Sequence, residues 1–217
     1  MLSQVMKCRT RELIAGVIAL AAFGSPSLAP AAQELRIGFV APTTGAFSQV
    51  GRDMVNGFQM YLDEVGSNFA GAKVTFIVED EEAKPPVAVR KAEKLIRQDK
   101  VHLFAGGLLA STGYALAPVS TRLKTVYVVS TPAADDLTQR DAAKYPYIIR
   151  TGWTSSQPSH PFGEWACQQG YKRIVTVGAD FAFGHEVVGG FQKAFEDCGG
   201  KIIQKIWPPL GAKDFGP

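Results

Sequence analysis

The feature that most constrains this chain is a regular alternation of short apolar segments with amphipathic ones. The apolar segments are rich in Val, Ile, Leu and Phe, as buried strands are, and lie at 35–40, 73–78, 101–105, 125–129, 147–150, 173–178 and 201–207. Apolar residues spaced by three and four positions predict the intervening helices, at 51–65, 86–99, 111–123, 161–169 and 184–198. This order predicts an α/β protein with parallel sheets flanked by helices.

The amino terminus has the pattern of an export signal. Lys7, Arg9 and Arg11 precede the uncharged apolar run Leu13–Phe23, and small residues follow up to position 32. This pattern predicts a secretory signal peptide over residues 1–32. The alternative, a membrane anchor, needs about 20 apolar residues, and this run is shorter. We therefore expect a periplasmic protein.

Two cysteines remain after the expected cleavage, Cys167 and Cys198. In an oxidising compartment they can form a disulfide. The alternative is a pair of separate, half-buried thiols. The sequence leaves both open.

Motifs for catalysis and for metal or cofactor binding are missing. The chain has no G-x-G-x-x-G, no P-loop lysine and no G-x-S-x-G, and its three histidines fall in different predicted elements. The formal net charge of +3 gives no support for a nucleic-acid surface. The acidic run 79–82 is interpreted as a solvated strand end. We expect no catalytic residue, no cofactor and no metal site.

Three loops that follow predicted strands are rich in small and hydroxyl residues. They cover residues 42–49, 109–113 and 130–135. Open α/β sheets bind ligands at the carboxyl ends of their strands, and a helix start offers backbone N–H groups to an anion. Ser111 or Thr112 is expected to cap the helix that follows the second loop. Whether Ser111 is only a cap or also contacts a ligand stays open.

Several segments together resemble a known family. They are LRIGFVAPTTGAFSQVGRDMVNGFQMYLDE from residue 35, VAVRKAEKLIRQDKVHLFAGG from residue 87, LTQR at 137–140, YIIRT at 147–151, RIVTVGADFAFGHEVVGGFQKAFEDCGGKI from residue 173, and the closing DFGP. In this order they are similar to the periplasmic solute-binding proteins of ABC importers, in the branched-chain amino-acid (leucine/isoleucine/valine-binding) group with the type I fold.

The resemblance implies two α/β lobes joined by three crossover strands, with the ligand between them. It assigns residues 33–151 to a nearly complete lobe one that ends in the first crossover, and residues 152–217 to a partial lobe two. Family members are much longer than this chain. We therefore expect a truncated member whose second lobe lacks most of its strands.

The resemblance also implies ligand-binding positions. They are Phe47, Gln49, Ala110, Ser111, Thr112, Ala133, Ala134 and Phe183. Alanine stands at 110 and 133, where branched-chain binders have hydroxyl residues, and this favours an apolar or aromatic acid. The expected function is capture of a small carboxylate, either an amino acid or an aromatic or apolar acid.

The same resemblance implies the partners. The expected protein is a monomer that delivers its ligand to an ABC permease in the inner membrane, binds no nucleic acid and is not an enzyme. Two alternatives stay open. One is the ligand-sensing domain of a receptor, and the other is a secreted α/β enzyme, for which no nucleophile–base pair can be assembled from the strand ends.

Overall fold

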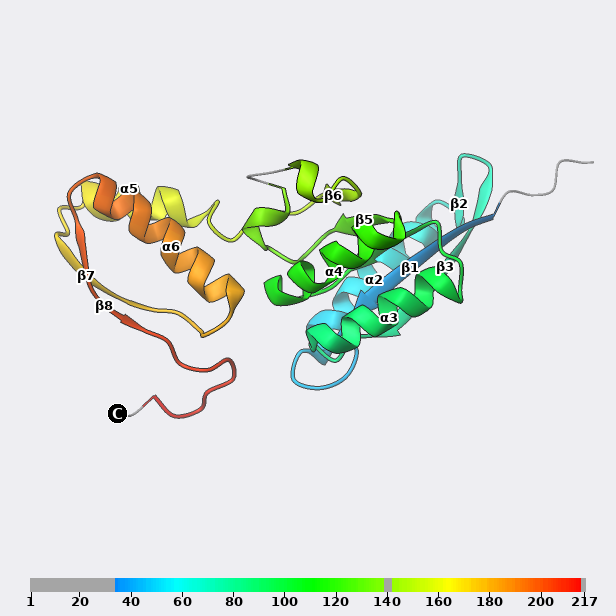
Figure 1. Ribbon diagram of the computed structural model, residues 1–217, viewed down its shortest axis with the longest axis horizontal. Coiled ribbons are helices and arrows are strands. Elements are labelled where there is room, and N and C mark those ends of the chain that lie inside the picture. Colours follow the sequence, from blue (N-terminus) through cyan, green and yellow to red (C-terminus); the bar gives the residue numbers. More distant parts are fainter. Residues whose placement is uncertain (1–33, 139–141, 216–217) are drawn as a thin grey trace, which may run out of the picture. The chain divides into compact units, whose positions relative to one another are not determined.

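The structure is a computed structural model and describes residues 34–138 and 142–215 (Figure 1). The expected signal peptide at 1–32 lies outside the described residues. Within them, no helix is both long and apolar enough to cross a membrane.

The larger sheet has six strands in the order β2-β3-β1-β4-β5-β6. Their bounds are β1 Glu34–Ala41, β2 Asn68–Phe69, β3 Ala72–Asp80, β4 Leu103–Gly106, β5 Val126–Val129 and β6 Ile148–Arg150. All neighbours pair in parallel except β2, which pairs antiparallel with β3. The loops that leave the parallel strands therefore share one edge of the sheet.

Helices cover both faces of this sheet because side chains alternate along each strand. From β1, Phe39 packs with α2 (Ser48–Glu64), whereas its neighbour Val40 belongs to the cluster formed with α3 (Pro85–Arg97) and α4 (Ala110–Leu123). Phe58 of α2 stacks on Phe76 of β3 with ring centroids 4.5 Å apart. The expected α/β class with helix-flanked parallel sheets is confirmed.

After β6 the chain forms a second, smaller α/β part. It contains α5 (Ser159–Gln168), β7 (Arg173–Val177), α6 (Ala182–Asp197) and β8 (Lys201–Ile206). The two strands pair in parallel with a register shift between Ile174 and Val175. One face of this pair packs on α5 and α6, whereas Val175, Val177 and Ile203 are exposed. This part has one helix-covered face and one open apolar face.

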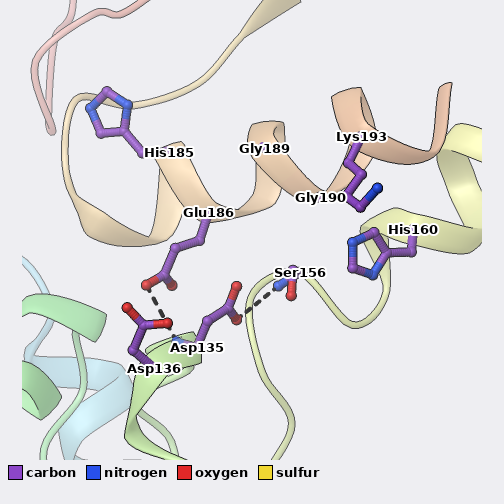
Figure 2. A pocket seen from close by; sticks show the side chains of 9 residues that line it. All are labelled: Asp135, Asp136, Ser156, His160, His185, Glu186, Gly189, Gly190 and Lys193. Atoms are coloured by element: carbon purple, nitrogen blue, oxygen red, sulfur yellow. Dashed lines mark hydrogen bonds between the residues drawn. The ribbon is translucent and has the colours of Figure 1, made fainter. Parts of the chain in front are cut away.

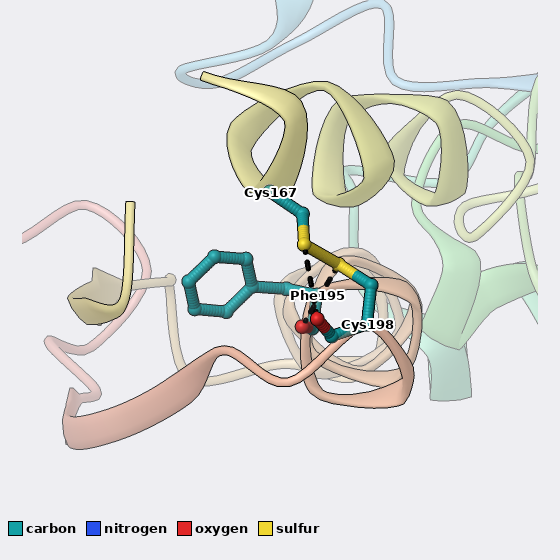
Figure 3. Close-up of a disulfide and its surroundings, with 3 residues drawn as sticks. All are labelled: Cys167, Phe195 and Cys198. Carbon is teal, nitrogen blue, oxygen red and sulfur yellow. Dashed lines mark hydrogen bonds between the residues drawn. A yellow bond between two sulfur atoms is a disulfide. The ribbon is translucent and has the colours of Figure 1, made fainter. Parts of the chain in front are cut away.

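A disulfide joins Cys167 of α5 to Cys198, the residue that ends α6, with Cα atoms 6.5 Å apart (Figure 3). The bridge lies beside the fully buried ring of Phe195. Of the two alternatives that the sequence left open, the structure has the disulfide.

Two expectations of the sequence analysis were wrong. Helix α4 begins at Ala110, and its N-cap residue is Leu109, so neither Ser111 nor Thr112 caps it. The chain turns through Gly106 and Gly107, both with positive φ, and enters the helix earlier than the hydroxyl residues indicated.

The acidic run 79–82 is not a uniformly solvated strand end, as we had expected. Glu81 is fully buried, whereas Glu82 is exposed and pairs with Lys84. A strand end at the edge between a sheet and a helix start can bury one side chain and expose its neighbour.

Candidate functional site

A pocket of about 270 Å³ lies where the loops after β1, β4 and β5 meet residues of the second part. We call it the cleft pocket. It is lined by Phe47, Val50, Leu108, Leu109, Ala110, Thr131, Ala133, Trp153, Phe181 and Phe183. These loops come together because parallel strands end at the same edge of a sheet.

The walls of the cleft pocket are aromatic and aliphatic. Phe183 makes an edge-to-face contact with Trp153, with ring centroids 5.8 Å apart, and lies 5.9 Å from the ring of Phe181. Thr131 supplies the only side-chain hydroxyl among the lining residues, and none of them is charged. Such a wall suits an aromatic or aliphatic ligand, because burying its surface excludes water from both partners.

The start of α4 is the polar element of this pocket. Leu109 makes no side-chain capping bond, and the first intrahelical donor is the N–H of Gly113, which binds the Leu109 carbonyl oxygen at 3.0 Å. Among the described residues, the backbone N–H groups of residues 110–112 have no protein acceptor. Of these three residues, Ala110 lines the cleft pocket, whereas Thr112 is fully buried. Unpaired N–H groups at a helix start attract an anion such as a carboxylate.

Arg150 at the end of β6 organises the neighbouring loop. Its guanidinium donates to the carbonyl oxygens of Pro132 (2.9 Å), Ala134 (2.5 Å) and Trp153 (3.0 Å) and to the hydroxyl of Thr138 (2.9 Å). Burial lowers the pKa of this group. An arginine side chain stays charged in proteins. One side chain thereby positions both the loop after β5 and the Trp153 wall.

Asp80 organises the loop after β1 in a similar way. Its carboxylate accepts hydrogen bonds from the Thr44 hydroxyl (2.5 Å) and from the N–H groups of Thr43 (3.0 Å) and Glu82 (2.9 Å). Burial opposes ionisation, but the hydrogen bonds outweigh it and lower the pKa of Asp80. The carboxylate thus holds the chain just ahead of Phe47.

A second, polar pocket of about 500 Å³ lies between the short helix η1 (Asp135–Leu137) and helices α5 and α6 (Figure 2). Its residues are Asp135, Asp136, Ser156, His160, His185, Glu186, Gly189, Gly190 and Lys193. We call it the acidic pocket. Its three carboxyl groups would repel a ligand carboxylate, so it is the weaker candidate for an acid.

Hydrogen bonds cross the acidic pocket. Glu186 accepts from the N–H of Asp135 (3.3 Å), and Asp135 accepts from the N–H of Ser156 (3.0 Å) (Figure 2). Glu186 also accepts from the Tyr114 hydroxyl. Burial and the bond to Glu186 raise the pKa of Tyr114, so it remains a donor. These bonds fasten α6 to α4 and to the loop after β5.

The expected site residues fall into two groups. Phe47, Ala110, Ala133 and Phe183 line the cleft pocket. The others do not: Gln49 is exposed and bonds Arg52 and Asp53, Ser111 is partly buried in the first turn of α4, and Thr112 and Ala134 are fully buried.

The expected site residues left out six residues that line the pocket: Val50, Leu108, Leu109, Thr131, Trp153 and Phe181. Of these, Leu109 and Thr131 lie in the loops that the sequence analysis singled out. Trp153 carried a usable signal, since it is a single large aromatic in the polar stretch 151–158. Leu108 and Leu109 lie just before the predicted helix at 111–123, and nothing in the sequence marks their side chains as pocket-lining. In the described ranges, no group of three or more His, Cys, Asp and Glu side chains could hold a metal ion.

Residues 34–217 match the family of periplasmic binding proteins. The chain belongs to this family. A curated relative from Brucella abortus, Leu/Ile/Val-binding protein homolog 6, is 28% identical over 200 residues, which cover 92% of this chain and 50% of the relative. The chain thus spans about half the length of the curated relatives that it matches.

Solved structures give the same fold. The solute-binding protein of an ABC transporter from Rhodopseudomonas palustris BisB5, in complex with 3,4-dihydroxybenzoic acid, is 32% identical with a TM-score of 0.75. The match covers 85% of this chain and 50% of that one. A second R. palustris solute-binding protein, in complex with benzoate, is 26% identical with a TM-score of 0.77 and covers 84% and 50% of the two chains. This periplasmic binding protein has the type I fold that the sequence analysis expected.

Proposed function

We propose that this chain is the extracytoplasmic substrate-binding component of an ABC importer and that it captures an aromatic carboxylate in the cleft pocket. The observation that carries the proposal is the combination of an uncharged, aromatic-lined pocket with the unpaired N–H groups at the start of α4. The ring of such a ligand contacts Phe47, Trp153 and Phe183, and its carboxylate accepts from the helix start.

The ligand class has support from relatives. Solved solute-binding proteins of this fold hold 3,4-dihydroxybenzoic acid and benzoate. A branched-chain amino acid is the second candidate, supported by the name of the Brucella relative. An amino acid also carries an ammonium group, which needs an acidic or carbonyl partner. Among the described residues, none that lines the cleft pocket is acidic, so the part of the lining that this chain supplies favours the aromatic acid.

The remaining parts of the proposal follow the family. Residues 1–32 are the signal peptide, 33–151 form lobe one, and 152–217 form the beginning of lobe two. Closure about the crossover near Thr151 encloses the ligand, and the closed monomer docks on a permease in the inner membrane. We propose no catalysis, because the pocket lining has no nucleophile paired with a base.

Ligand-induced stabilisation tests this proposal. We expect benzoate, 4-hydroxybenzoate and 3,4-dihydroxybenzoate to raise the thermal midpoint of the full chain, and leucine and valine to leave it unchanged. Trp153→Ala should weaken benzoate binding about tenfold, because it removes one wall. Trp165→Ala is the matched control, since Trp165 is equally exposed but lies outside the cleft pocket.

Stabilisation by leucine or valine alone would overturn the aromatic assignment. Absence of stabilisation by any of the five compounds would overturn the proposed binding function for this chain. An equal loss of affinity in both tryptophan variants would remove the cleft pocket as the site.

A further inference from the structure

Behind the start of α4 lies a buried carboxyl group that the ligand site does not use directly. Glu81 follows β3 and is fully buried. Its Oε1 atom accepts the N–H of Leu108 at 2.9 Å. Its Oε2 atom is buried and makes no hydrogen bond of normal geometry, although the Thr112 hydroxyl lies close enough to lower the pKa of this carboxyl group. A buried carboxylate oxygen without a donor is costly, whereas a protonated carboxyl needs only an acceptor there.

The side chains around Glu81 supply no positive charge. Thr112 of α4 lies close, yet its own buried Oγ1 also lacks a hydrogen bond of normal geometry. Tyr127 of β5 donates its hydroxyl to the Gly106 carbonyl oxygen at 3.0 Å, so that proton is already used. Asp80, which ends β3 and directly precedes Glu81, adds a like charge.

The two acidic residues before Glu81 have ion-pair or hydrogen-bond partners. Glu79 pairs with Lys91 and with Lys94, each at 2.6 Å. Asp80 accepts the three hydrogen bonds described above. Among the described residues, Glu81 has no ion pair. The guanidinium of Arg150 in β6 acts on Tyr127 and is not among the groups that shift the pKa of Glu81.

Desolvation therefore governs the protonation of this group. Burial raises the pKa of Glu81, the Leu108 N–H and the Thr112 hydroxyl lower it, and the charge of Asp80 raises it. The net direction is upward, so Glu81 keeps its proton to a higher pH than an exposed glutamate does.

The position of Glu81 links its charge to the ligand site. Leu108, whose amide Glu81 accepts, lines the cleft pocket and precedes the first residue of α4 by two positions. A ligand carboxylate at the helix start brings a negative charge to the other side of the same short turn. Two negative charges separated by one turn of poorly solvated backbone repel each other, and protonation of Glu81 removes that repulsion.

We propose that Glu81 is a proton-coupled positioning residue: its carboxyl group takes up a proton when a ligand carboxylate binds at the start of α4, and the neutral form holds the Leu108 amide in place. This inference rests on the proposed function. It makes capture of the anionic ligand stronger at acidic pH, through a residue that does not touch the ligand.

The protonation state can be measured without any ligand. Carbon-13 NMR of the full chain with labelled glutamate carboxyl groups gives the titration midpoint of each residue, and Glu81→Gln assigns the Glu81 signal by its loss. We expect the Glu81 midpoint to lie above the ordinary value of 4.5 and to rise when benzoate is added. A midpoint at or below that value would overturn the proposal.

Calorimetric titration with benzoate across a pH series tests the coupling. In the unmodified chain, affinity should fall by up to about tenfold per pH unit above the Glu81 midpoint, which is the limit for uptake of one proton. Glu81→Gln is uncharged at every pH and still offers an oxygen to the Leu108 N–H. The affinity of this variant for benzoate should therefore be high and should not change with pH. Glu82→Gln is the matched control and should behave like the unmodified chain, because Glu82 is exposed.

The outcomes separate this inference from the function on which it rests. Benzoate binding with the same pH profile in the unmodified chain and in Glu81→Gln overturns the coupling and leaves the proposed function intact. Absence of benzoate binding in both proteins overturns the proposed function and the coupling with it.

Discussion

Arg150 offers the sharpest test of how the cleft pocket is held together. Its guanidinium makes four hydrogen bonds, to Pro132, Ala134, Thr138 and Trp153, and three of the acceptors are backbone carbonyl oxygens. Arg150→Met keeps a similar apolar stem and removes every donor. The variant therefore leaves the carbonyl groups without a protein partner at the junction of β6 and the loop after β5.

The magnitude follows from these contacts. Each hydrogen bond to a charged group contributes about 1.5–3 kcal/mol to stability. The full sum does not apply, because the four bonds are coupled and water can reach a half-buried site. About 4 kcal/mol is the loss that we expect, a large part of the roughly 5–15 kcal/mol that stabilises a typical domain. If the free energy of unfolding falls by about 2 kcal/mol for each molar of urea, the urea concentration at the unfolding midpoint drops by about 2 M.

Urea unfolding followed by circular dichroism measures this loss. Arg150→Lys should fall between the two proteins, because lysine keeps the charge but not the planar fork. Arg173→Met is the control, since Arg173 is exposed at the start of β7. A midpoint for Arg150→Met within the range of the Arg173→Met control would refute the reasoning that this guanidinium holds the site.

Three further outcomes are expected. Reduction of the Cys167–Cys198 bridge, which closes a separation of 31 residues, should lower the free energy of unfolding by about 4 kcal/mol; equal urea midpoints with and without reductant would contradict this. For Glu79, burial raises the pKa, but the hydrogen bonds to Lys91 and Lys94 outweigh burial and lower the pKa below the ordinary 4.5. The ionised Glu79 therefore stabilises the folded chain above that pH, and this contribution is lost as the pH falls through the lowered pKa. Glu79→Gln should thus be less stable at neutral pH, and the difference should vanish in acid; a constant difference would exclude the ion pairs as the cause. Gly106→Ala should cost about 3 kcal/mol or more, because φ is +96° and the new Cβ would lie 2.2 Å from the Val40 carbonyl oxygen, whereas Gly57→Ala in open space should stabilise the chain in the same thermal melt.

Most of the scaffold could be predicted from local pattern. Period-two alternation separates Phe39, which faces α2, from Val40, which faces α3 and α4, and the same reasoning assigns the helix faces. Strand β2 was missed, since two residues that pair across a turn carry no periodic signal. Some element ends shifted by up to three residues, because caps and turns depend on the neighbouring chain.

The candidate site was predicted in outline and not in detail. The rule that ligands bind at the carboxyl ends of parallel strands pointed to the loops after β1, β4 and β5, and residues of these loops, among them Phe47 and Ala133, line the cleft pocket. Phe183 of α6, expected from the family resemblance, also lines it. Thr112 was expected beside them, but its side chain points into the protein. Which side of a helix start faces the pocket depends on where the helix begins, and the two glycines before it set that point.

The sequence by itself determined the order of strands and helices, the faces that they bury and the loops that meet at the sheet edge, because these follow from residue periodicity and from the geometry of parallel strands. Only the tertiary structure decided the fate of individual polar and reactive groups. Glu79, Asp80 and Glu81 are consecutive acids, yet one pairs with two lysines, one holds a loop and one is buried without a counter-charge. Charge and burial at a site depend on segments far away in the chain, such as the Leu108 amide and the lysines of α3, and no local pattern carries that information.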